Sequence, residues 1–246
     1  MSFLCGFVIE IIVSSFFRVV QTLSDILSGL ILGVHFGTGF IASLWYHRFN
    51  STTEVLFMKT NQKISTKKIV MTALMAALTV AGSSLRVTIP VDIAGTTSFH
   101  LGNIMCALSG ILLGPGYGAL AAGLGSAAYD MMNPLYISEA WITFLTKAAY
   151  GLMSGVVAWS GKKPWAYFKA TSAAVAGAVT YALLYLAKTC FYSGMLMKGL
   201  PLDAAALTVI TKLPATTFNA VVAVIFAPVL AIAIRKALEK NRISLD

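Results

Sequence analysis

Long apolar stretches recur along this chain and limit what it can fold into. We expect six of them to form helices, over approximately 69–85, 100–114, 116–132, 139–160, 168–190 and 204–235. A helix of about 20 apolar residues crosses the roughly 30 Å hydrocarbon core of a bilayer. Only 11% of the residues are charged, against about 25% in soluble domains. The sequence therefore predicts an all-α fold, a polytopic membrane protein built as a six-helix transmembrane bundle.

Glycine and proline mark where these spans end or bend. The segment GPGYG at 114–118 separates the second span from the third and predicts a tight helical hairpin. Pro214 and Pro228 lie inside the long last span, where we expect them to kink the helix.

The first 57 residues form an apolar N-terminal extension that differs from the rest. Its apolar runs are interrupted by Arg18, Gln21 and Asp25, and Met58 then precedes the Lys-rich segment KTNQKISTKK. Many bacterial membrane proteins begin with such a segment, so we expect a mis-assigned start, with 58–246 as the natural six-helix domain. The alternative is one or two genuine extra helices. A signal peptide has less support, because a basic n-region and a small-residue cleavage site are missing.

The basic residues predict the orientation. With a cytoplasmic start, the inner loops carry Lys59, Lys63, Lys67, Lys68, Lys162, Lys163, Lys169, Arg235, Lys236, Lys240 and Arg242. The outer loops carry only Arg86 and Lys198. The positive-inside rule thus predicts a multi-pass protein of the bacterial cell membrane, with both ends of the six-helix domain inside. The net charge of +9 follows from this arrangement and does not indicate a nucleic-acid partner.

Polar residues inside the spans point to a pocket. Lys147, Lys188 and Lys212 lie within apolar helices, where a charge costs about 2.5–3.5 kcal/mol at the bilayer centre and usually faces a cavity or a partner. Two stripes at helical spacing comprise Glu139, Thr143, Lys147 and Tyr150 on the fourth span, and Thr208, Thr211, Lys212 and Asn219 on the sixth. They predict a wet pocket between these helices, bordered by Tyr129, Asp130 and Asn133 at the outer end.

Structural interpretations compete with this pocket. A Glu–Lys pair could simply hold the bundle together, and Asp130 could cap the loop that follows it. For Lys188 we favour a side chain that snorkels to the outer surface.

Motifs for catalysis or metal binding are missing. Cys5, Cys106 and Cys190 are isolated, and GVVAWSGKK at 155–163 lacks the spacing of a P-loop. His100 is the only histidine in the six-span region. We expect neither an enzyme nor a bound cofactor or metal.

The order of features resembles the substrate-binding S component of energy-coupling factor (ECF) transporters. The resemblance rests on the Lys-rich start, TALMAALTVA, the outward connector, LGNIMCALSGILLGPGYGALAAGLGSAAYD and the six-helix layout, and it covers about Met58 to Lys240. It implies a subunit that captures a vitamin or cofactor precursor from outside. Delivery inward would then require a transmembrane T subunit and two ATPase subunits.

The resemblance also implies roles for particular residues. Small residues recur every fourth position on the first span, at Ala73, Ala77 and Ala81, and such a face lets another helix approach closely. In the family an AxxxA pattern here contacts the T subunit. The connector 86–99 corresponds to the loop that closes the pocket, with Gly95 supplying flexibility. Its candidate ligand contacts are Asp92, Thr96, Thr97 and Ser98.

The substrate stays open at this point. Members of the riboflavin type tend to carry a Phe-Asn pair and then a Lys on the sixth helix; here Phe218 and Asn219 are present but the Lys is missing. Lys147 and Lys212 would suit a carboxylate or another electron-rich ligand, and the candidates are a flavin, pantothenate, a pyridoxine-like ring or a queuosine precursor. The alternatives are a stand-alone secondary transporter, although no internal repeat is found, and a membrane-embedded enzyme.

Overall fold

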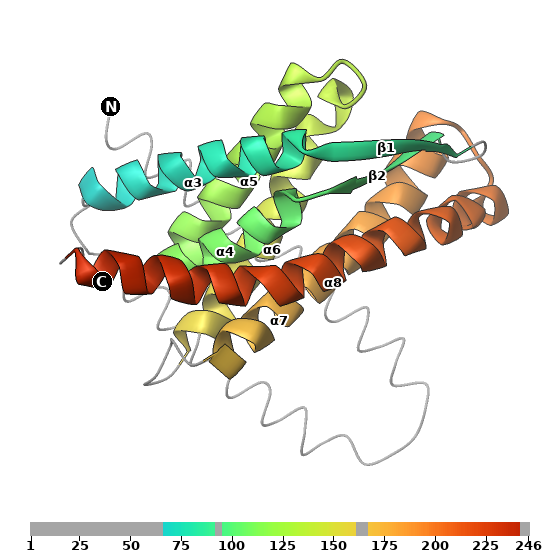
Figure 1. Cartoon of the computed structure of the whole chain (residues 1–246). Helices are drawn as coiled ribbons and strands as arrows, with labels where there is room; N and C mark the ends of the chain where they lie inside the picture. The colour runs from blue at the N-terminus through green and yellow to red at the C-terminus, as the bar shows by residue number, and fades with distance from the viewer. Residues whose placement is uncertain (1–65, 92–94, 161–166, 242–246) are drawn as a thin grey trace, which may run out of the picture. The chain divides into compact units, whose positions relative to one another are not determined.

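The computed structural model describes residues 66–91, 95–160 and 167–241, drawn in colour in Figure 1. All of them belong to the second of two units of the chain, Asn61–Asp246. The extension 1–57 lies outside the described residues, so the expected start at Met58 remains a prediction. The same holds for the candidate ligand contact Asp92.

Six α-helices account for most of the described residues. They are α3 (Thr66–Ser84), α4 (Gly102–Leu113), α5 (Pro115–Met132), α6 (Ala140–Trp159), α7 (Tyr167–Ala187) and α8 (Leu202–Lys240). Each coincides with one predicted span, and the predicted helical bundle is confirmed. A 3₁₀ turn, η2 (Ile137–Glu139), precedes α6, and α7 continues as a π-helix, η3 (Lys188–Met197). The helix α8 runs through Pro214 and Pro228 as a single element.

The predicted connector 86–99 forms a β-hairpin. Strand β1 (Arg86–Val91) pairs antiparallel with β2 (Gly95–His100), and Arg86 lies opposite His100. The sequences RVTIPV and GTTSFH are rich in β-branched residues, which favour strands. His100, expected at the start of a helix, therefore ends a strand, and α4 begins at Gly102. The strands extend beyond the ends of α3 and α4 (Figure 1).

Glycines allow α4, α5 and α6 to pack with their backbones in contact. A Cβ added to Gly118 would lie 2.5 Å from the Cα of Gly110, and one added to Gly151 would lie 2.5 Å from the carbonyl oxygen of Gly118. Neither space can hold a side chain. Between α4 and α5 the chain reverses at Gly114, whose φ of 82° favours glycine, and Pro115 then opens α5. The hairpin predicted at 114–118 is confirmed.

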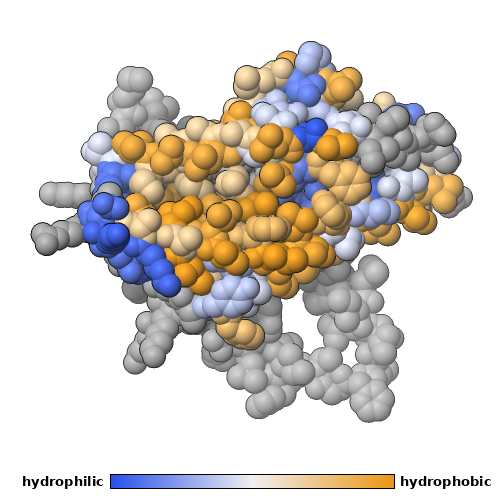
Figure 2. Space-filling view, viewed as in Figure 1, coloured by the Kyte–Doolittle hydropathy of each residue, from blue (hydrophilic) through white to orange (hydrophobic). Residues whose placement is uncertain are grey.

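The outer surface of the helices is apolar. Two stretches, Tyr167–Met197 and Ala204–Lys240, are long and apolar enough to cross a membrane. In the view of Figure 2 the apolar surface over α3 and α8 is broad, and a hydrophilic cluster lies at the end of α8 where Lys236 and Lys240 are exposed. The number of membrane crossings and the orientation of the termini remain predictions.

Candidate functional site

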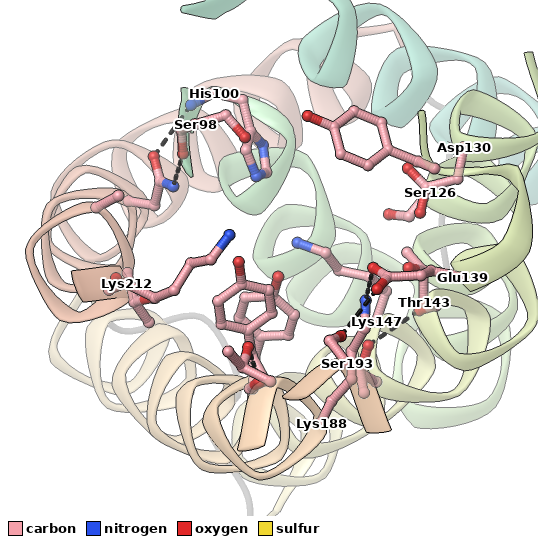
Figure 3. A pocket seen from close by; sticks show the side chains of 18 of the residues that line it. Ser98, His100, Ser126, Asp130, Glu139, Thr143, Lys147, Lys188, Ser193 and Lys212 are labelled. Carbon is pink, nitrogen blue, oxygen red and sulfur yellow. Dashed lines mark hydrogen bonds and ion pairs between the residues drawn. The ribbon is translucent and has the colours of Figure 1, made fainter. Parts of the chain in front are cut away.

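A cavity of about 210 Å³ lies where the hairpin meets the helices. Side chains from α3, α4, α5, α6, α7 and α8 line it together with both strands and the π-helix. Of the residues predicted to contact a ligand, its walls contain Ser98, Asp130, Glu139, Thr143, Lys147, Thr208, Lys212 and Asn219. The two predicted stripes therefore meet at one cavity. In Figure 3, Lys147 and Lys212 extend from opposite sides toward its middle.

Two other predicted contacts, Tyr150 and Tyr129, lie outside the cavity lining, and the side chains of Thr96 and Thr97 lie outside the described residues. Tyr150 is fully buried and its ring stacks on that of Tyr181, with the centroids 5.5 Å apart, so it supports the cavity wall from behind. The ring of Tyr129 lies against the guanidinium of Arg86, 4.6 Å from its centroid, and is not part of the cavity lining. Thr96 and Thr97 belong to β2.

Sequence reasoning missed about two thirds of the lining. Polar and aromatic residues that it did not single out as ligand contacts are Ser83, Arg86, His100, Asn103, Ser126, Tyr136, Thr146, Tyr181, Tyr185, Lys188, Thr189, Ser193, Lys198 and Thr216. Many lie on α3, α4, α7 and the π-helix, whereas the prediction relied on the fourth and sixth spans. Lys188 could have been added to the predicted ligand contacts, because it is a lysine inside an apolar span.

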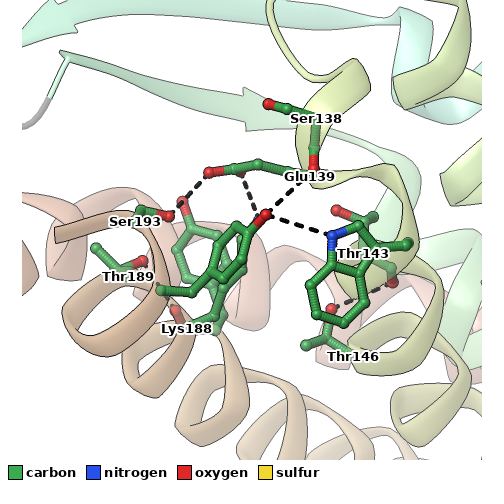
Figure 4. Close-up of polar contacts among 10 residues, drawn as sticks. Ser138, Glu139, Thr143, Thr146, Lys188, Thr189 and Ser193 are labelled. Atoms are coloured by element: carbon green, nitrogen blue, oxygen red, sulfur yellow. Dashed lines mark hydrogen bonds and ion pairs between the residues drawn. The ribbon is translucent and has the colours of Figure 1, made fainter. Parts of the chain in front are cut away.

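Lys188 is buried in an ion pair and does not snorkel to the surface as expected. Its Nζ lies 2.6 Å from Oε2 of Glu139, and the side chains are 7% and 27% exposed, respectively. Ser193 donates a hydrogen bond to the other carboxylate oxygen at 2.8 Å (Figure 4). Residues five apart lie on the same face of a π-helix, which is why Lys188 and Ser193 reach the same carboxylate.

The Glu139 carboxylate is ionised in this arrangement. Burial alone would raise its pKa, but the charge of Lys188 and the hydrogen bonds from Lys188 and Ser193 hold the pKa of Glu139 below its usual value. Because Glu139 precedes α6 and Lys188 begins the π-helix, the pair fixes one rim of the cavity.

Lys147 is buried, and its direct contacts are neutral groups. Its side chain projects from α6, and the residue is 4% exposed. The ammonium donates a hydrogen bond to Oδ1 of Asn103 on α4 and lies 3.8 Å from the ring centroid of Tyr181 on α7. An amide oxygen and an aromatic face both stabilise a cation, but neither neutralises it.

Asn219 attaches the hairpin to α8. Its Oδ1 accepts a hydrogen bond from the backbone N–H of His100 at 3.0 Å, and its Nδ2 donates one to the carbonyl oxygen of Ser98 at 2.9 Å. The neighbouring rings of Phe99 and Phe218 meet edge to face, with centroids 5.1 Å apart. The amide thus binds the edge of β2 as a neighbouring strand would. In this structure, both polar groups of Asn219 are engaged with the hairpin.

The His100 side chain lines the cavity. Burial, together with the positive charges of Lys147 and Arg86, holds the pKa of His100 well below its usual value. Among the described residues, no group of His, Cys, Asp and Glu side chains is arranged to hold a metal ion.

Two comparisons with known proteins found a similarity. The sequence model of the family described as "ECF-type riboflavin transporter, S component" matches residues 63–236. A solved structure, the S component for biotin from an ECF-type ABC transporter, is similar at 16% sequence identity and a TM-score of 0.46, covering 68% of this chain and 94% of that chain. Comparison with curated proteins found no match. The family match spans more than half of the sequence and describes transport components rather than enzymes. The chain belongs to the family of ECF-type riboflavin transporter S components.

Proposed function

We propose that this chain captures a water-soluble vitamin or cofactor precursor in the cavity beneath the hairpin. It then delivers the molecule inward together with a T subunit and two ATPases. The observation that carries the proposal is the convergence of the polar faces of α6 and α8 on one cavity next to the hairpin. Buried polar groups without a structural need usually mark a ligand path in a membrane protein.

The exposed face of α3 supports docking to a T subunit. Ala73, Ala77 and Ala81 are exposed along this helix, whereas Met75 and Thr79 face the bundle. A row of small residues lets a second helix approach closely in lipid, where packing rather than the hydrophobic effect drives association. We propose that this row is the docking surface, with both termini of the six-helix domain in the cytoplasm.

The candidate substrates remain a flavin, pantothenate, a pyridoxine-like ring and a queuosine precursor. The family name favours riboflavin. The Phe218–Asn219 pair also matches members of the riboflavin type. In this chain, however, both residues contact the hairpin.

Reconstitution tests this function directly. Tagged chain, co-expressed with a T subunit and two ATPases, should recover them on purification, and vesicles containing the complex should accumulate a vitamin only when ATP is supplied. Uptake by the chain alone, driven by protons or sodium, would instead establish a secondary transporter.

Two substitutions on α3 separate docking from binding. Ala77→Trp should stop ATP-driven uptake and leave ligand binding intact, because the large ring prevents close approach of the T subunit. Leu74→Trp is the matched control: Leu74 is 51% exposed on the same helix but outside the alanine row. Loss of ligand binding in Ala77→Trp would show that the row serves internal packing.

A further inference from the structure

Among the residues that the structure describes, positive charge exceeds negative charge around the cavity. Its cationic residues are Arg86, Lys147, Lys188, Lys198 and Lys212, and its acidic residues are Asp130 and Glu139. Glu139 is already bound to Lys188 at 2.6 Å. Asp130 is then the one remaining acid among the described lining residues, and Arg86 and Lys147 are cations that line the same cavity.

Lys147 carries the strongest part of this excess. It is almost completely buried, yet its contacts are the amide oxygen of Asn103 and the ring of Tyr181. Within the described part of the chain it forms no ion pair with a carboxylate. An ammonium withdrawn from water needs a counter-ion to offset its lost hydration energy. A cation–π contact recovers only a fraction of that energy.

Arg86 and His100 lie at the same part of the cavity. The Arg86 guanidinium contacts the rings of Tyr129 and Tyr136, 4.6 and 4.8 Å from their centroids. Its Nε atom and the Nδ1 atom of His100 are buried, and neither has a hydrogen-bond partner among the described residues. Both nitrogens can donate to an anionic oxygen, Arg86 always and His100 in one tautomer.

The space itself is small and partly aromatic. At about 210 Å³ it lies below the roughly 300–1,000 Å³ of pockets for drug-sized ligands. Tyr181 and Tyr185 line one side as a stacked pair with centroids 5.6 Å apart. Such a wall suits a compact ligand with an apolar or planar part.

We propose that the cavity binds a small organic anion whose charged oxygens face Lys147, Arg86 and His100 and whose apolar part lies against Tyr181 and Tyr185. The proposal rests on the capture function above and narrows it to one substrate class. Lys212, on the opposite side, adds a third cation. Carboxylates and phosphate monoesters share the required chemistry.

Matched pairs of ligands test the charge requirement. The purified full chain is titrated with pantothenate and panthenol, nicotinate and nicotinamide, and flavin mononucleotide and riboflavin, and binding is followed by calorimetry. We expect the anionic member of a pair to bind at least about tenfold more tightly than its neutral partner. The flavin pair separates a phosphate from the two carboxylates. A neutral member that binds as tightly as its anionic partner would overturn the proposal.

A second measurement needs no identified ligand. Without added ligand, Lys147→Met should leave the melting temperature unchanged or raise it, because it removes a buried charge that forms no ion pair among the described residues. Lys188→Met is the matched control and should lower the melting temperature, because it leaves Glu139 unpaired. If Lys147→Met lowers it as much as the control does, Lys147 is a structural cation and the inference is wrong.

Uptake by reconstituted vesicles distinguishes this inference from the proposed function. ATP-driven uptake of a neutral vitamin would retain the capture function and reject the anionic substrate. Tight binding of an anion without any ATP-driven uptake would retain the anionic ligand and reject the capture function.

Discussion

The cavity and the contact between α4, α5 and α6 are built from opposite kinds of residue. Where these three helices meet, glycines bring the backbones together until no side chain fits, as between Gly118 and Gly110. Around the cavity, long charged side chains converge from several helices and leave open space. The glycine contact cannot accept an added atom. The cavity holds groups that would be more stable in water.

This contrast separates stability from function. Close backbone packing gains dispersion energy and holds the helices at fixed positions. Buried charges such as Lys147 cost stability, so their presence calls for another role. We therefore expect substitutions at the glycine contact to damage the fold and those at the cavity to change binding, except where a cavity residue also connects two elements.

The largest expected effect is at Gly118. Gly118→Leu should abolish folded protein, and Gly118→Ala should lower the melting temperature, because a Cβ there would lie 2.5 Å from the Cα of Gly110 and backbone cannot move aside as a side chain can. Fluorescence-detected size-exclusion chromatography measures the folded fraction.

Gly116 provides the control on the same helix. An added Cβ there has nothing within 4 Å, so Gly116→Ala should be neutral or stabilise by up to about 1 kcal/mol through helix propensity. Equal effects of alanine at the two positions would contradict the proposed contrast.

A smaller loss is expected at Glu139, where the cavity rim also connects two elements. Glu139→Gln leaves Lys188 buried without its counter-ion and should cost about 2–3 kcal/mol of unfolding free energy, somewhat less than for a fully buried pair because Glu139 is 27% exposed. Chemical denaturation measures the loss. The double variant Glu139→Gln/Lys188→Met should recover most of it, and an additive loss would mean that the two residues do not act as a pair.

The same residue predicts a pH dependence. The pKa of Glu139 is lower in the folded protein than in the unfolded chain, so its stabilising contribution is complete above the unfolded value of about 4.3 and is lost as the pH falls through the folded value. Unfolding of the wild type and Glu139→Gln, compared from pH 7 downward, should show a difference that narrows in acid. A constant difference would contradict an ionised Glu139.

The smallest effect is expected at Asn219. Asn219→Ala removes both hydrogen bonds to β2 and should cost about 1–2 kcal/mol, with faster hydrogen exchange at the His100 amide. Ligand dissociation should accelerate by roughly tenfold, as such a free-energy difference implies. Thr211→Val is a control on the same helix, because the Thr211 hydroxyl donates its hydrogen bond within α8, to the carbonyl oxygen of Thr208. Unchanged exchange at His100 in Asn219→Ala would show that the hairpin is held in another way.

The six helices could be predicted because their signals are local. Apolar length marks each span, and Gly114 and Pro115 mark the reversal between two of them. The hairpin was missed because its polar composition resembled that of a loop, although the β-branched residues of β1 and β2 favour strands.

The cavity could be predicted only from the helices that carry a regular stripe. Thr143 and Lys147 repeat at helical spacing on α6, so their common face was visible in the sequence. The partners of this face are distant along the chain: Asn103 is 44 residues from Lys147, and His100 is 119 residues from Asn219. No local pattern marks such pairs, since they form only when the helices pack.

The length of α8 has a consequence for how the protein sits in a bilayer. Its 39 residues correspond to about 58 Å at 1.5 Å per residue, nearly twice the roughly 30 Å thickness of the hydrocarbon layer. The helix must therefore tilt strongly, emerge into the headgroup region, or do both. In an upright orientation, a ligand entering beside Thr208 would meet the protein near the level of the headgroups and would not have to cross the acyl chains.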